Sequence, residues 1–251
     1  MSQLLLANHA HVCVSGDQVV ILDLRRDKYS CFDLVDASPL SNLVPGWPIS
    51  SLQAATAPIT DSDEAVRDLL NAEILTTNYT FGREVNPIEL NVGTDEILQP
   101  RSVFDDHSKP RHPISTEHRT AFFSAIARTK LSMRMFTLER VLSQTARRRE
   151  QAALTVTDPP SKHIDESDQE ALRVLVANYR WLRPWGYTSK DRCLFGSLAL
   201  AEYLAAFGVY PDLVIGVKTA PFAAHCWVQL SNMVLNDYAG KVREYTPIMA
   251  V

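Results

Sequence analysis

The sequence predicts an α+β protein built from two units, and three observations lead to this prediction. Short apolar runs separated by turn residues fill residues 10–34, as in a small antiparallel sheet. Helical spacings of apolar residues dominate residues 116–150 and 168–181. A further helix pattern begins at Cys193, and apolar runs typical of strands follow it.

Composition narrows the class of protein. The chain has 251 residues, of which 46% are apolar and 22% charged, which is typical of one or two folded, soluble domains. A net charge of −4 gives no basic surface for nucleic acid, and no apolar run is long enough to span a membrane. The N-terminus has no signal-peptide pattern. We therefore expect a cytoplasmic protein that binds neither nucleic acid nor membrane.

The four cysteines are scattered, and no CxxC pair occurs: they are Cys13, Cys31, Cys193 and Cys226. This distribution predicts neither a metal site nor a disulfide framework. A reducing cytoplasm would keep a nucleophilic thiol free.

The first part of the chain reads as strands followed by helices. Strands are expected at residues 11–15, 19–24 and 28–32, with a turn at Ser15-Gly16-Asp17. A short helix or turn at 39–47 and a helix at 60–75, N-capped by Thr60 or Asp61, would follow. This layout predicts a small winged-helix-like unit.

The middle of the chain has a proline-rich connection and then helices. Residues 81–115 are expected to be a linker, and residues 116–150 one long helix that ends in Arg147-Arg148-Arg149. That basic run is either a binding site for an acidic peptide or a solvated helix end. The aromatic residues before Cys193 either line a substrate cleft or belong to the core; they are Trp181, Trp185 and Tyr187.

Cys193 stands where a helix should begin. Leucines and alanines follow it at helical spacing, and Gly208 is placed as a helix C-cap. A helix N-terminus favours an anion, so it would lower the pKa of the thiol and make the sulfur a nucleophile. The backbone N–H of Cys193 could also help to hold an oxyanion.

His225 and Asp237 complete a candidate catalytic set. His225 lies in a strand pattern at 222–230, and Asp237 ends a short partner strand after a turn at Asn232. A hairpin of this kind can bring the carboxylate to the imidazole, which would then take the thiol proton. Each residue taken alone has a structural alternative: a packed thiol, a hydrogen-bonded core histidine or a turn aspartate.

The C-terminal part resembles the B protein of lasso-peptide biosynthesis, a leader peptidase with a transglutaminase-like, papain-like cysteine peptidase domain. The resemblance rests on the words CLFGSLALAEYLAAFGV, DLVIGVKTAPFAAHCWVQL, VLND and YTPI. It implies that Cys193 is the nucleophile, His225 the base and Asp237 the residue that orients it. Cys226 departs from the family, which often has a small residue there, and we expect it to be a core side chain.

The N-terminal part resembles, in its layout and in ILDLRRDKYSCFD, the precursor-peptide recognition element of such pathways. The resemblance implies that a leader peptide adds as a strand along one edge and packs against a helix. The implied contact residues are Tyr29, Ser30, Cys31, Phe32, Val66, Leu69 and Leu70. The alternative is that these side chains cover the small core. DNA binding is not expected, because helix 61–73 is mostly acidic.

Together these patterns predict a leader-recognition domain at 1–80, a linker at 81–115 and a peptidase domain at 116–251. The reaction would be hydrolysis of the leader–core amide bond. Two alternatives remain: a transglutaminase-like acyl transferase and a non-catalytic precursor-binding module. The resemblance also implies two partners, the precursor and a lasso cyclase of the asparagine-synthetase type, through which ATP would be required. No cofactor motif and no P-loop are present.

Overall fold

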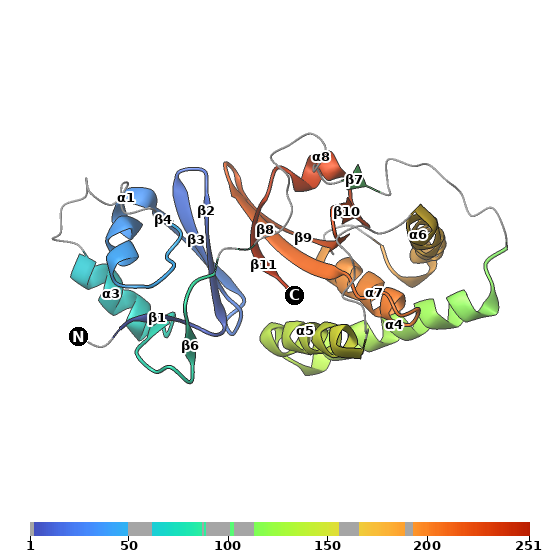
Figure 1. The fold of residues 1–251 in the computed structure, drawn as a ribbon, viewed down its shortest axis with the longest axis horizontal. Coiled ribbons are helices and arrows are strands. Elements are labelled where there is room, and N and C mark those ends of the chain that lie inside the picture. The colour runs from blue at the N-terminus through green and yellow to red at the C-terminus, as the bar shows by residue number, and fades with distance from the viewer. Residues whose placement is uncertain are drawn as a thin grey trace. The chain divides into compact units, whose positions relative to one another are not determined.

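The structure is a computed structural model that describes residues 3–49, 62–86, 88, 101–102, 113–155, 166–188 and 193–251. Helices and sheets are both well represented, so the predicted α+β class is confirmed (Figure 1). The chain forms two compact units. The first comprises Met1–Glu89, Gly216–Ala224 and Tyr245–Met249, and the second comprises Leu90–Ile215, His225–Glu244 and Ala250–Val251.

The first unit contains two small sheets. One is the antiparallel meander of β2 (Ala10–Ser15), β3 (Gln18–Asp23) and β4 (Lys28–Asp33), close to the three strands that the sequence predicts. The other places β1 (Leu5–Ala7) between β5 (Leu75–Thr76) and β6 (Gly82–Arg83). Since β6 pairs with β1, the first unit extends past the boundary expected at residue 80.

Among the described residues of this unit, three helices accompany these sheets. They are α1 (Leu34–Ala37), the 3-10 helix η1 (Ser38–Asn42) and α3 (Ser62–Asn71). The helix expected at 60–75 ends earlier than predicted, because Glu73 has a positive φ of 58° and the chain then enters β5. Its expected caps, Thr60 and Asp61, lie outside the described residues.

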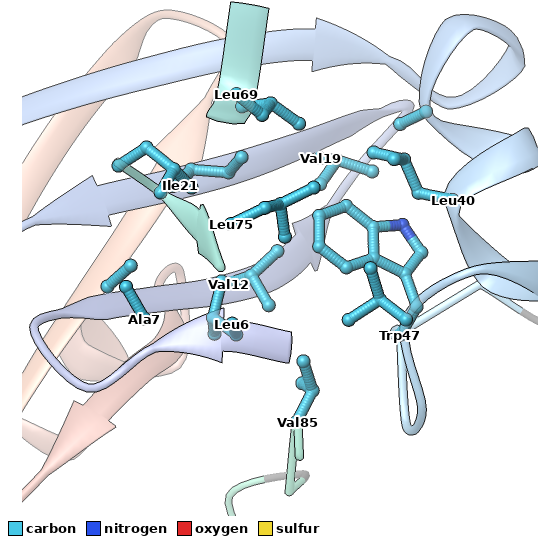
Figure 2. Close-up of a cluster of buried hydrophobic side chains, with 14 of the residues drawn as sticks. Leu6, Ala7, Val12, Val19, Ile21, Leu40, Trp47, Leu69, Leu75 and Val85 are labelled. Atoms are coloured by element: carbon cyan, nitrogen blue, oxygen red, sulfur yellow. The ribbon is translucent and has the colours of Figure 1, made fainter. Parts of the chain in front are cut away.

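A single apolar cluster holds the first unit together. Figure 2 shows side chains from β1, β2, β3, β5 and α3 meeting beside the indole ring of Trp47. The members that are at most 3% exposed include Leu6, Val19, Ile21, Leu40, Val44 and Leu75. Burial of such side chains is the main favourable contribution to the folding of the unit.

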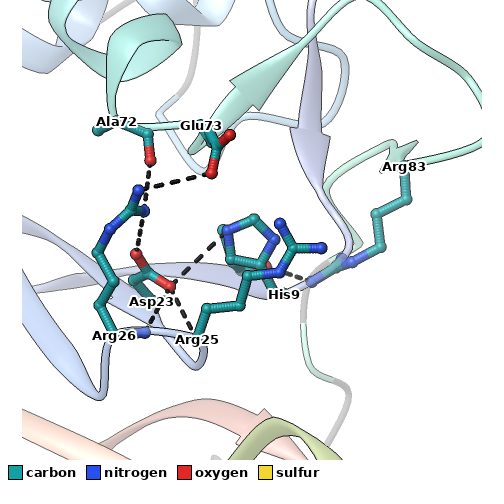
Figure 3. A network of polar contacts seen from close by, with 8 residues as sticks. His9, Asp23, Arg25, Arg26, Ala72, Glu73 and Arg83 are labelled. Atoms are coloured by element: carbon teal, nitrogen blue, oxygen red, sulfur yellow. Dashed lines mark hydrogen bonds and ion pairs between the residues drawn. The ribbon is translucent and has the colours of Figure 1, made fainter.

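Arg26 fastens the end of α3 to the turn after β3 (Figure 3). Its Nη1 donates to the carboxylate of Asp23 at 2.9 Å and to the carbonyl of Ala72 at 2.7 Å. The same carboxylate accepts the backbone N–H of Arg25 at 2.9 Å. A charged donor therefore satisfies a carbonyl that the helix end leaves unpaired.

Four long helices belong to the second unit: α4 (Thr116–Met135), α5 (Leu138–Thr155), α6 (Glu166–Gly186) and α7 (Cys193–Ala205). The prediction of one helix at 116–150 is wrong. The backbone of Phe136 is extended (φ −126°, ψ 155°), which ends α4 and lets a second helix start in a new direction. The hydroxyl of Ser115 caps the start of α4.

The basic run of α5 is neither a helix end nor solvated throughout. It lies inside α5, where Arg148 pairs with Glu202 of α7 and Arg149 pairs with Asp212 at 2.5 Å. These ion pairs join α5 to other elements of the second unit. The side chains of Arg148 and Arg149 therefore have structural partners within the chain.

A five-stranded sheet has the order β11-β8-β9-β10-β7. Its strands are β7 (Arg101–Ser102), β8 (Asp212–Thr219), β9 (Phe222–Leu230), β10 (Met233–Val234) and β11 (Thr246–Ala250), and the short helix α8 (Ala239–Val242) precedes β11. The predicted strand at 222–230 coincides with β9. β7 comes from the expected linker and pairs in parallel with β10. No described helix is both long and apolar enough to cross a bilayer.

Candidate active site

Cys193 is the first residue of α7, as the sequence predicts. The helix behind it is mostly apolar, and Leu198, Leu200 and Leu204 are at most 3% exposed. α7 is therefore anchored in the core of the second unit, against α4 and α6. The Cys193 side chain, by contrast, is exposed at the helix N-terminus, where backbone N–H groups favour a thiolate.

His225 lies in the middle of the sheet, on β9. Residues of a strand alternate between its two faces, so His225, Trp227 and Gln229 share one face. The rings of His225 and Trp227 are stacked with centroids 6.2 Å apart, and the Trp227 Nε1–H donates to Gln229 at 3.1 Å. His225 is only 9% exposed, so its ring is held by its neighbours rather than by solvent.

Asp237 follows β10 and meets the imidazole. The His225 Nε2 lies 2.6 Å from Asp237 Oδ2, and the Lys241 ammonium donates to the same oxygen at 2.8 Å. The backbone N–H of Tyr238 donates to the other oxygen at 2.9 Å. Burial alone would raise the pKa of Asp237, but these hydrogen bonds lower it to about 2.

The thiol and the imidazole are hydrogen-bonded to each other. This bond with His225 lowers the pKa of Cys193, and the backbone N–H groups of Cys226 and Leu194 lower it further, against the effect of burial. Burial also opposes protonation of His225, but its hydrogen bonds with Asp237 and Cys193 raise its pKa overall. The donation of Nε2–H to Asp237 leaves Nδ1 to receive the thiol proton.

The structure therefore brings together Cys193, His225 and Asp237, the three residues that the sequence singled out. Cys226 is buried behind them, and burial raises the pKa of its thiol. All four cysteines are free thiols, and the pKa is lowered at Cys193 alone. This arrangement can supply a nucleophile, a general base and a group that orients the base.

Sequence reasoning missed a second layer of residues that joins the three elements of the site. Ser197, one helical turn after Cys193, donates to the carbonyl of Cys226 at 2.9 Å. Asn236, next to Asp237, donates to the Ser197 Oγ at 2.8 Å and accepts the N–H of Val228 at 2.8 Å. Two signals in the sequence could have indicated these residues. Ser197 is a lone serine in an apolar helix, and Asn236 precedes Asp237 after a strand.

The aromatic residues before Cys193 have different surroundings. Tyr187 is half-buried beside Cys193, and its hydroxyl is 3.0 Å from that of Tyr179. Trp181 and Trp185 are 57% and 78% exposed, so the core alternative does not hold for these two residues. Of the three, Tyr187 alone lines the pocket that opens at Cys193.

The residues implied in leader binding lie in the first unit. Tyr29 and Ser30 are half-buried on β4, and Cys31 is exposed. Phe32, Val66 and Leu69 pack in or against the apolar cluster, whereas Leu70 is 38% exposed. Among the described strands, β4 pairs only with β3. No other described strand pairs with the second edge of β4.

Residues 132–250 match the model of the transglutaminase-like superfamily. This region runs from the end of α4 to β11 and contains Cys193, His225 and Asp237. All three residues therefore lie within the one matched region. In the described part of the chain, no three His, Cys, Asp or Glu side chains are grouped as metal ligands.

The chain is also similar to the microcin J25-processing protein McjB of Escherichia coli. The two are 39% identical over 61 residues, which is 24% of this chain and 29% of the relative. The similarity thus spans less than a third of that protein. No solved structure matches the chain.

Proposed function

We propose that this chain is a leader peptidase of lasso-peptide biosynthesis, which hydrolyses the amide bond between the leader and the core of a ribosomally made precursor. The observation that carries the proposal is the hydrogen-bonded series Cys193–His225–Asp237, in which the pKa of the thiol is lowered. Similarity to a protein that processes microcin J25 supports a precursor peptide as the substrate.

The reaction follows from the roles of the three residues. The Cys193 sulfur attacks the carbonyl carbon, and the His225 imidazolium gives its proton to the leaving amine of the core. The leader then remains on Cys193 as a thioester. Water, deprotonated by His225, cleaves the thioester and releases the leader as a carboxylic acid. The Cys193 backbone N–H at the start of α7 can stabilise the oxyanion in both steps.

The proposal assigns leader binding to the first unit, as a winged-helix-like recognition element. A leader strand would add to the edge of β4 through main-chain hydrogen bonds along Tyr29, Ser30, Cys31 and Phe32. The exposed Leu70 on α3 could contact the leader directly, whereas Val66 and Leu69 would support the helix from the core. A lasso cyclase that consumes the freed core would be the partner through which ATP is required.

The test requires a precursor peptide, which should be sought as a short reading frame beside the gene for this chain. The wild-type protein should release leader and core, detected by mass spectrometry. Cys193→Ala should bind the leader with unchanged affinity but cleave nothing. Full cleavage by Cys193→Ala would remove the peptidase proposal, and equal inactivity of both proteins with intact leader binding would favour a non-catalytic binding module.

The match to the transglutaminase-like superfamily favours a second candidate, an acyl transferase. The same three residues would form the thioester, and an amine rather than water would resolve it. The product mass separates the two reactions, because hydrolysis adds water to the leader whereas transfer adds the amine. A leader that ends in a free carboxylic acid in the presence of excess amine supports the peptidase.

A further inference from the structure

A pocket of about 520 Å³ opens directly beside Cys193, within the second unit. Three helices form it: the C-terminal half of α4, the end of α6 and the first turn of α7. Its lining residues on α4 are Ile126, Lys130, Met133 and Arg134, which recur at the spacing of one helix face. A side chain of a substrate held at the sulfur can therefore reach this pocket.

Among the described residues that line the pocket, Lys130 and Arg134 carry a positive charge, no carboxylate is present, and both cations are exposed. Within the described residues, neither forms an ion pair with a carboxylate. Burial raises the pKa of the Tyr187 hydroxyl in the pocket wall, and Arg183, which does not line the pocket, lies close enough to oppose this rise. This local charge contrasts with the net charge of −4 of the whole chain.

The rest of the pocket wall is apolar and held in place. The rings of Tyr187 and Phe195 meet edge to face with centroids 5.0 Å apart. The hydroxyl of Tyr179 contacts the Tyr187 hydroxyl at 3.0 Å and the carbonyl of Gly196 at 3.3 Å. A Cβ at Gly196 would come within 2.9 Å of the Tyr187 hydroxyl, so the glycine lets this wall pack closely.

We propose that this pocket binds an acidic side chain, glutamate or aspartate, of the substrate peptide next to the bond that is cleaved. The methylene groups of such a side chain can pack against Phe195 and Ile126 while the carboxylate meets Lys130 and Arg134. A lysine or arginine in the same place would be repelled. The proposal rests on the peptidase function and adds the class of residue that the enzyme selects.

The first experiment measures selectivity at the sulfur with the full-length protein. The probes are acetylated tripeptide vinyl sulfones that carry glutamate, glutamine or lysine at the residue adjoining the warhead or at the one before it. Second-order rates of Cys193 modification are measured by intact mass. At one of the two positions, we expect glutamate to react about tenfold faster than glutamine, and lysine to be the slowest.

Variants assign that selectivity to the pocket. The double variant Lys130→Met/Arg134→Gln should remove the preference for glutamate over glutamine, while Arg128→Gln, an exposed cation outside the pocket lining on the same helix, should retain it. Equal rates for the glutamate and glutamine probes at both positions would overturn the proposal. So would a preference that persists in the double variant.

A second measurement decides the proposal even if the thiol does not react. The affinities of fluorescent glutamate and glutamine tripeptides for Cys193→Ala are compared with and without the pocket substitutions. Tighter binding of the glutamate peptide, lost in the Lys130→Met/Arg134→Gln background, supports the proposal, and equal binding overturns it. An unreactive Cys193 would count against the peptidase function alone, so the two failures are distinguishable.

Discussion

One oxygen of Asp237 receives two cationic partners, which makes this residue the centre of the site's electrostatics. Oδ2 accepts from His225 at 2.6 Å and from Lys241 at 2.8 Å. The carboxylate favours a protonated imidazole, whereas the charge of Lys241 lowers the pKa of His225. Lys241, which the sequence did not single out, therefore positions the carboxylate and limits the pKa of the base.

Lys241→Met should raise the pKa of His225, because a repelling positive charge is removed. The thiolate–imidazolium pair exists between the lowered pKa of Cys193 and the raised pKa of His225, so its upper pH limit should move upward. We expect the alkaline limb of kcat/KM for precursor cleavage to shift to higher pH. Lys241→Arg, which keeps the charge, should follow the wild type, and superimposable profiles for all three proteins would contradict this role.

Three parts of the chain carry Cys193, His225 and Asp237, and one pair of polar side chains connects them. Ser197 on α7 donates to the β9 backbone, and Asn236 beyond β10 donates to Ser197 and accepts from β9. Ser197 is completely buried. The relative positions of the thiol, imidazole and carboxylate thus depend on hydrogen bonds that other residues make.

Ser197→Ala should therefore damage stability and catalysis together. The lost hydroxyl leaves the Asn236 amide and the Cys226 carbonyl without a partner, at a cost of about 1–3 kcal/mol of unfolding free energy. Loosened geometry should also lower kcat by at least about tenfold. Thr120→Ala, which removes an exposed helix hydroxyl on α4, serves as the control. Wild-type kcat in Ser197→Ala would show that this connection does not position the site.

In the first unit, His11 should make the stability dependent on pH. Burial, Arg83 and His9 lower its pKa to about 3, and the Arg83 Nη2 lies 3.2 Å from its Nδ1, an arrangement that requires a neutral ring. The unfolded chain binds a proton that the folded chain excludes. The contribution of His11 to the free energy of unfolding should therefore be greatest above pH about 6.5. It should decrease toward pH 3, by up to about 1.4 kcal/mol per pH unit.

Chemical denaturation at several pH values checks this dependence. His11→Gln should flatten the slope between about pH 6.5 and 3, because the titrating group is gone. The same slope in His11→Gln and in the wild type would assign the acid sensitivity to other groups.

Local patterns in the sequence were sufficient for the elements whose periodicity is unbroken. Alternation located β9, and the apolar spacing after Cys193 located α7, so the elements that carry Cys193 and His225 could be predicted directly. The helix break at Phe136 could not be predicted, because the apolar spacing continues across it. The sheet built on β1 could not either, since its strands are two or three residues long and pair across more than sixty residues.

Interactions between distant residues set the remaining features of the site. The contact of Lys241 with Asp237 was within reach of sequence reasoning, because the residues are four apart. The Ser197–Asn236 bond and the approach of α4 to Cys193 join segments far apart in the chain. Such contacts follow from tertiary packing, which no local periodicity encodes.

In the whole molecule, the proposed leader binding and the proposed chemistry belong to different units. The candidate leader edge on β4 lies in the first unit, and Cys193, His225 and Asp237 lie in the second. If the leader holds the precursor on the protein, cleavage of a tethered core resembles an intramolecular reaction. Leader recognition would then affect how much substrate reaches the sulfur rather than how fast the bound substrate reacts.

A short peptide that spans only the cleaved bond should accordingly show a raised KM. We expect kcat/KM to fall by about 10²–10⁴ relative to the full precursor. The rate of Cys193 alkylation by iodoacetamide should be the same whether or not free leader is present. Equal kcat/KM for the short peptide and the full precursor would contradict a contribution from the first unit.

The most direct test of the central claim is the pH dependence of alkylation at each of the four cysteines, followed by peptide mass mapping. Cys31 is the internal control, because its thiol is also exposed but burial raises its pKa. We predict that Cys193 reacts first, with an apparent pKa below that of Cys31, and that His225→Ala removes this advantage. Equal rates at Cys193 and Cys31 near pH 6, or a Cys193 profile unchanged by His225→Ala, would contradict the account.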